Sequence, residues 1–140
     1  MNFGLNDDQQ MLRDTFARFL DTESSMARVR AANDAGGFDP ALWRGLAELG
    51  TFAMRVPEAA GGLAMGTFDA ALVMEEAGRT LAPGPIAEAI LAARLLGQLG
   101  SDALDEVTSG AKVATLAFHD IAWRPVQWLA GGGHAGLGVA

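Results

Sequence analysis

The segment PIAEAILAARLLGQ, residues 85–98, decides the fold class of this sequence. Its apolar side chains recur at the spacing of one helix face, at Ile86, Ala89, Ile90, Ala93 and Leu96. Glu88, Arg94 and the flanking prolines interrupt the apolar stretch, so we predict a buried helix and not a membrane span. The small residues on this helix would allow another backbone or a ligand to approach closely.

Helix signals also lie upstream of this segment. Asn6 opens a capping-box pattern, in which a side chain accepts a hydrogen bond from the first helical turn. A second helical stretch is expected over residues 23–32. Asp39-Pro40 predicts the start of a third helix, as cap and first-turn proline, and Gly50 is suited to end it.

Further helices are predicted on either side of residues 85–98. Residues 55–62 are too rich in Pro and Gly for regular structure, so we expect a loop there. A helix is expected to begin near Thr67 and to end before Pro83, and a short last helix reaches about Ser109. We therefore predict a mainly α fold, with a helical domain of about five to six helices over residues 1–110.

The character of the chain changes near Lys112. Residues 112–118 are typical of a strand, and residues 126–129 can form a second one. A lone strand or hairpin is only marginally stable in water, so further strands would be needed. We therefore expect residues 111–140 to be an incomplete β segment, the start of another domain.

The composition excludes several classes of function. The chain has 140 residues, a formal net charge of -7 and no cysteine. The lack of cysteine excludes a disulfide framework and a thiolate metal site, and the acidic balance argues against a nucleic-acid partner. The first four residues lack the pattern of a signal peptide, so we predict a cytoplasmic protein.

Isolated polar residues carry little chemistry in this sequence. His119 and His134 lack further ligands at compatible spacing, so we predict no metal site. Glu75 and Glu76 are adjacent, and neighbours on a helix point about 100° apart. We expect one of them to be solvated and the other to pair with Arg79, although a general-acid role stays open.

Four short motifs follow one another along the chain: WRGLAELG at 43–50, VPE at 56–58 before Gly61-Gly62, EEAGR at 75–79 and LAF at 116–118. Their order resembles that of the acyl-CoA dehydrogenase family, over roughly residues 5–120. The resemblance implies a helical N-terminal domain, a middle β domain and a C-terminal four-helix bundle. It also implies an acyl-CoA substrate and an FAD held partly across a subunit interface of a homo-oligomer.

The same resemblance implies roles for particular residues. Phe118, His119 and Asp120 follow the first strand, where the family faces the flavin, and we expect them to contact FAD. The N-terminal domain of the family walls the acyl pocket. Plain core packing explains equally well the six candidates for that wall, which are Met74, Ala77, Ile86, Ala89, Ile90 and Ala93.

Two departures limit what this chain can do alone. Ala60 precedes the glycine pair, where the family often has an aromatic residue, and His119-Asp120-Ile121 stands where the family has Thr-Glu-Pro before a Gly-Ser turn. The resemblance therefore implies that this chain by itself does not hold FAD. The glutamate that removes the α-proton in the family has no counterpart here, so we assign no catalytic residue.

The sequence thus predicts the N-terminal part of an FAD-dependent acyl-CoA dehydrogenase, inactive alone, that needs its remaining domains or a partner subunit. One alternative is a non-catalytic acyl-binding or assembly subunit of a heteromeric complex. Another is a related flavin-dependent acyl-CoA oxidase, since the N-terminal domain does not separate the two activities.

Overall fold

The computed structural model of this chain describes residues 4–118 and 129–130. The described part is mainly helical, as predicted, and holds six α-helices, one 3-10 turn and one pair of short strands. The elements are α1 (Asp7–Glu23), α2 (Met26–Asp34), α3 (Pro40–Glu48), η1 (Glu58–Ala60), α4 (Thr67–Arg79), α5 (Ile86–Leu99), α6 (Leu104–Thr108), β1 (Ala117–Phe118) and β2 (Leu129–Ala130).

The helix starts follow the capping signals in the sequence. Asn6 accepts a hydrogen bond from the Gln9 backbone N–H at 2.8 Å, and the Gln9 side chain accepts one from the Asn6 N–H. These two bonds form the expected capping box and satisfy amides that have no partner inside the helix. Asp39 caps α3 with its side chain alone, which accepts hydrogen bonds from the N–H groups of Ala41 and Leu42, and Pro40 lies in the first turn.

Two expected boundaries were wrong. The stretch expected over 23–32 is divided between α1, which continues through Glu23, and α2, which begins at Met26. The Ser24 N–H donates to the carbonyl of Leu20, so the helical hydrogen-bond pattern of α1 runs past the expected boundary. The strand expected over 112–118 covers only 117–118. Lys112 is instead tied to Glu106 of α6 by its backbone N–H and its ammonium group.

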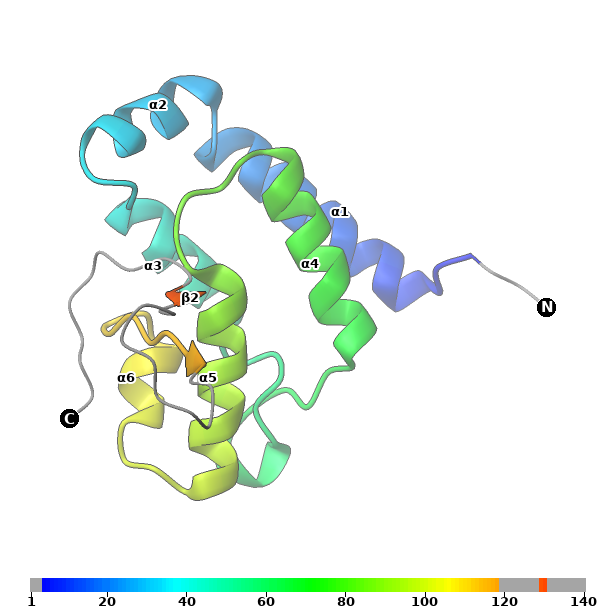
Figure 1. Cartoon of the computed structure of the whole chain (residues 1–140). Coiled ribbons are helices and arrows are strands. Elements are labelled where there is room, and N and C mark those ends of the chain that lie inside the picture. Colours follow the sequence, from blue (N-terminus) through cyan, green and yellow to red (C-terminus); the bar gives the residue numbers. More distant parts are fainter. Residues whose placement is uncertain (1–3, 119–128, 131–140) are drawn as a thin grey trace.

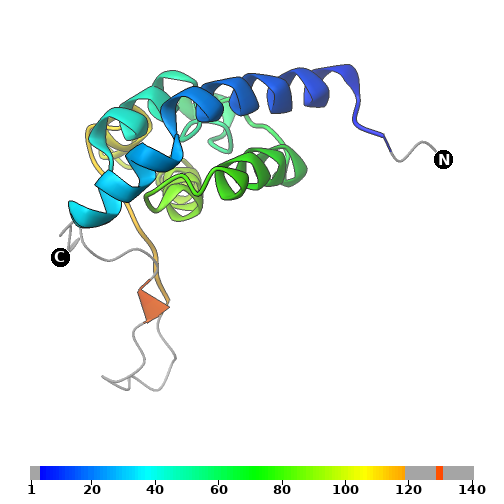
Figure 2. The same cartoon turned by 90° about the horizontal axis from the view of Figure 1, so that it is seen from above.

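The helices form two neighbouring pairs. α1 and α4 lie side by side, and α6 packs against α5 (Figure 1). Turned by 90°, the molecule shows the short strand pair projecting from the helical body (Figure 2). β1 and β2 are antiparallel, with Ala117 opposite Ala130 and Phe118 opposite Leu129. The assignment of residues 111–140 to a middle β domain stays a prediction.

The main core lies between α1, α3, α4, α5 and the segment 51–54. Trp43 is at its centre, with ring centroids 4.3 Å from Phe52 and 5.5 Å from Phe38. A smaller cluster joins α5 and α6 through Ala93, Leu104 and Val107. Burial of these apolar side chains supplies most of the driving force that holds the helices together.

One glycine lets α1 and α3 approach closely. A Cβ atom on Gly45 would lie 2.6 Å from Cζ of Phe19, which is inside van der Waals contact. The WRGLAELG motif therefore supplies both the core tryptophan and a close contact between helices.

Candidate functional site

The structure places most of the residues predicted to wall an acyl pocket inside the domain. Ala77, Ile86, Ala89 and Ile90 belong to the main core, and Ala93 belongs to the smaller cluster; all five are at most 3% exposed. Met74 is half-buried and packs against the main core. This is where core packing alone would place these side chains. Their role in a pocket stays a prediction.

The opposite face of α5 is apolar but open. Leu91, Leu95 and Leu99 lie four residues apart and are 47%, 46% and 79% exposed. The described part of this chain covers one side of α5, and these three leucines lie on the other side. Our sequence reasoning missed this face, although three leucines at four-residue spacing were a readable signal of it.

The turn before α5 sets the position of that helix. The N–H groups of Leu81 and Ala82 donate back to the last turn of α4, at 3.1 Å to Gly78 O and 2.9 Å to Ala77 O. Leu81 has a φ of +53°, a left-handed conformation that favours glycine, and its side chain is 59% exposed. The turn therefore holds an exposed leucine in a strained backbone.

The two neighbouring glutamates of α4 have different environments, as predicted. Glu75 is exposed, whereas Glu76 is 8% exposed and accepts a hydrogen bond from Nε of Arg79 at 2.6 Å. Arg79 also pairs with Asp21 of α1 at 2.9 Å. The bond to Glu76, and then the bond to Asp21, raise the pKa of Arg79. Arg79 thus joins α4 to α1, and Glu76 is its partner on α4.

The residues predicted to contact a flavin are mostly outside the described part. Phe118 lies in β1, while His119 and Asp120 are not among the described residues. Residues 4–118 and 129–130 contain no group of three His, Cys, Asp or Glu side chains that could hold a metal ion. Over the same residues, no helix is long and apolar enough to cross a membrane.

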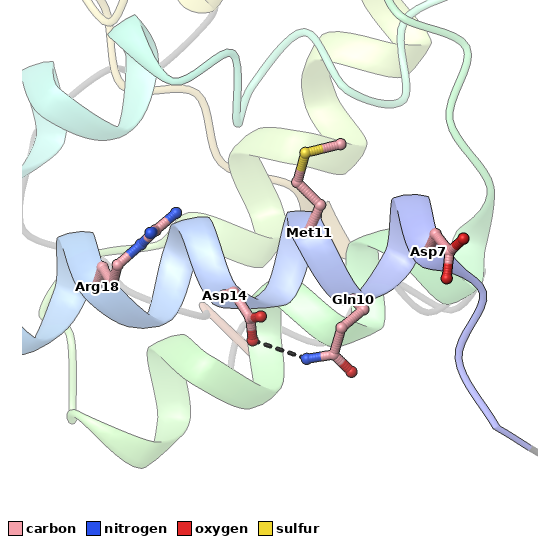
Figure 3. Close-up of a pocket in the computed structure, with 5 residues that line it drawn as sticks. All are labelled: Asp7, Gln10, Met11, Asp14 and Arg18. Carbon is pink, nitrogen blue, oxygen red and sulfur yellow. Dashed lines mark hydrogen bonds between the residues drawn. The ribbon is translucent and has the colours of Figure 1, made fainter.

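A shallow surface hollow runs along the outer side of α1 (Figure 3). Met11 points to one side of the helix, and Gln10 and Asp14 point to the other and share a 2.8 Å hydrogen bond. All of its lining residues come from one helix, so the hollow has no second wall to enclose a ligand; they are Asp7, Gln10, Met11, Asp14 and Arg18.

Comparison with known proteins gives the helical domain a family. Residues 6–108 match the family described as "Acyl-CoA dehydrogenase, N-terminal domain". The chain is 37% identical over 118 residues to acyl-CoA dehydrogenase IpdE2 of Mycolicibacterium smegmatis, a match that covers 82% of this chain and 38% of that protein. It is 38% identical over 104 residues to benzylmalonyl-CoA dehydrogenase of Aromatoleum aromaticum, covering 72% of this chain and 27% of that protein.

Solved structures share the fold. A variant of the Tcur3481-Tcur3483 steroid ACAD superposes with a TM-score of 0.72 at 28% identity, covering 82% of this chain and 33% of that one. The ChsE4-ChsE5 complex from Mycobacterium tuberculosis gives a TM-score of 0.73 at 25% identity, covering 87% and 36%. The chain therefore spans less than two-fifths of each of these four relatives. The family match covers most of the chain, which therefore belongs to the acyl-CoA dehydrogenase family, with residues 6–108 corresponding to its N-terminal domain.

Proposed function

We propose that this chain is the N-terminal part of an FAD-dependent acyl-CoA dehydrogenase, in which it forms one wall of the acyl pocket. The observation that carries the proposal is the family match over residues 6–108, on a domain with the same helical fold as solved relatives. The match covers 38% of the length of IpdE2. The complete active site would therefore need further domains or another subunit.

The exposed face of α5 supports a specific position for this wall. A ligand that approaches the folded domain meets the exposed leucines first, because the buried face is already in contact with the core. We assign the acyl contact to Leu91 and Leu95. The six residues predicted from the sequence then have an indirect role, because their packing in the core holds α4 and α5 in place. They are Met74, Ala77, Ile86, Ala89, Ile90 and Ala93.

The proposed role of this chain is to bind the acyl group and to exclude water from it. In the proposed enzyme, FAD held by residues outside those described would supply the hydride acceptor for α,β-dehydrogenation of the acyl group. An apolar wall keeps water away from the α and β carbons and contacts the acyl chain through its methyl groups. Among the described residues we assign no base, since Glu75 is exposed and Glu76 is paired with Arg79.

The flavin contacts expected from the sequence lie mostly outside the described residues. Of the three residues expected to contact a flavin, only Phe118 is described, and it lies in a two-residue strand. Isoalloxazine and pyrophosphate groups need several polar contacts from a preformed site. We therefore propose that flavin binding requires residues outside those described.

A second candidate function follows from the solved relatives. One of them is a complex of two proteins, ChsE4 and ChsE5, and the name of the other joins Tcur3481 to Tcur3483. On this alternative, the chain is a non-catalytic acyl-binding or assembly subunit of a heteromeric complex. If the chain purifies in a complex with a separate flavoprotein subunit, this result would favour the heteromeric alternative over a single longer polypeptide.

The names of the relatives also suggest a substrate class. One relative is a benzylmalonyl-CoA dehydrogenase and another a steroid ACAD, and both names indicate an acyl group that carries a ring. We propose a ring-bearing acyl-CoA in place of a simple straight-chain one. We also propose a cytoplasmic location and a homo-oligomeric state. A flavin-dependent acyl-CoA oxidase stays an alternative, since the N-terminal domain does not separate the two activities.

Methyl NMR on the 140-residue chain tests the acyl wall. The probes are 3-phenylpropionyl-CoA and octanoyl-CoA, with free CoA as the control. We expect the methyl signals of Leu91 and Leu95 to shift with the acyl-CoA probes, while those of Leu63, a similarly exposed leucine elsewhere, stay in place. Shifts confined to Ile86 and Ile90 would instead assign the acyl contact to the buried face.

A separate experiment tests inactivity of the chain alone. The purified chain is incubated with FAD, passed through a desalting column, and mixed with each acyl-CoA. We expect no retained flavin absorbance and no bleaching. Retained flavin that an acyl-CoA reduces would contradict the proposal that the catalytic site lies outside this chain.

A further inference from the structure

We draw no further inference here: the strongest candidate, the exposed apolar face of α5 at Leu91, Leu95 and Leu99, belongs to the site already described, and nothing in the described residues shows what else covers it.

Discussion

Replacing Asp39 tests how the local sequence holds the third helix in place. One carboxylate oxygen of Asp39 accepts hydrogen bonds from the N–H groups of Ala41 and Leu42, at 2.9 and 3.0 Å. The other accepts one from Arg28 of α2 at 3.0 Å. The Asp39 side chain is only 15% exposed, so water replaces these bonds poorly when the carboxylate is removed.

The expected loss combines two contributions. An N-cap side chain contributes about 1 kcal/mol. A partly exposed ion pair such as Arg28–Asp39 adds about 0.5–1 kcal/mol. We therefore expect Asp39→Ala to lower the free energy of unfolding by about 1.5–2 kcal/mol, the sum of these contributions. Asn caps a helix nearly as well as Asp, so Asp39→Asn should lose only the ion-pair share, about 0.5–1 kcal/mol.

Urea denaturation followed by far-UV circular dichroism measures both losses. The matched control is Glu48→Ala, which removes an exposed carboxylate from the same helix and should change stability by less than about 0.5 kcal/mol. Equal losses in the Ala and Asn variants would refute the capping argument. A loss in Asp39→Ala no larger than that of Glu48→Ala would refute both contributions.

The Asp39 carboxylate also makes the free energy of unfolding depend on pH. Burial raises the pKa of Asp39, but the hydrogen bonds from the Leu42 N–H and from Arg28 outweigh it, and the net pKa lies below the ordinary 3.8. A lowered pKa means that ionised Asp39 stabilises the fold above the unfolded pKa, and that this contribution is lost as the pH falls through the folded value. The stability difference between the native chain and Asp39→Ala should therefore be constant near neutral pH and shrink below about pH 4. A difference that grows on acidification would contradict the sign.

Three further substitutions probe other parts of the structure. A Cβ on Gly62 would lie 2.2 Å from the carbonyl oxygen of Val56, so Gly62→Ala should cost about 3 kcal/mol or more in thermal unfolding, and a near-neutral result would contradict the close packing of this loop. Leu81→Gly relieves a φ of +53° at an exposed position and should raise stability by roughly 0.5–1 kcal/mol in urea titrations, whereas a loss would mean that the Leu81 side chain makes a stabilising contact. Leu91→Glu should change stability by less than about 0.5 kcal/mol but abolish the acyl-CoA-dependent NMR shifts, and shifts that persist would remove Leu91 from the acyl wall. Ile90→Ala, on the buried face, should instead lower stability by about 2–5 kcal/mol.

The sequence predicted the helix starts well where contacts between residues a few positions apart determine them. Asn6 and Asp39 mark helix starts because their side chains bond to amides two or three residues away. Two separate helices were predicted here, but the break between them was placed too early, before Glu23 and not after it. The pairing of Glu76 with Arg79 was predicted because it spans three residues of one helix.

The sequence by itself determined that a helix with an apolar face forms over about residues 85–98, and the ordered motifs indicated the family of the chain. Only the tertiary structure decided which face of that helix is buried. Periodicity favoured the face of Ile86, Ala89 and Ile90 but could not distinguish a core from a pocket wall, because both are lined by small apolar side chains. Burial depends on which distant segments pack there, and the main core, with Trp43 at its centre, covers these residues while Leu91 and Leu95 stay open.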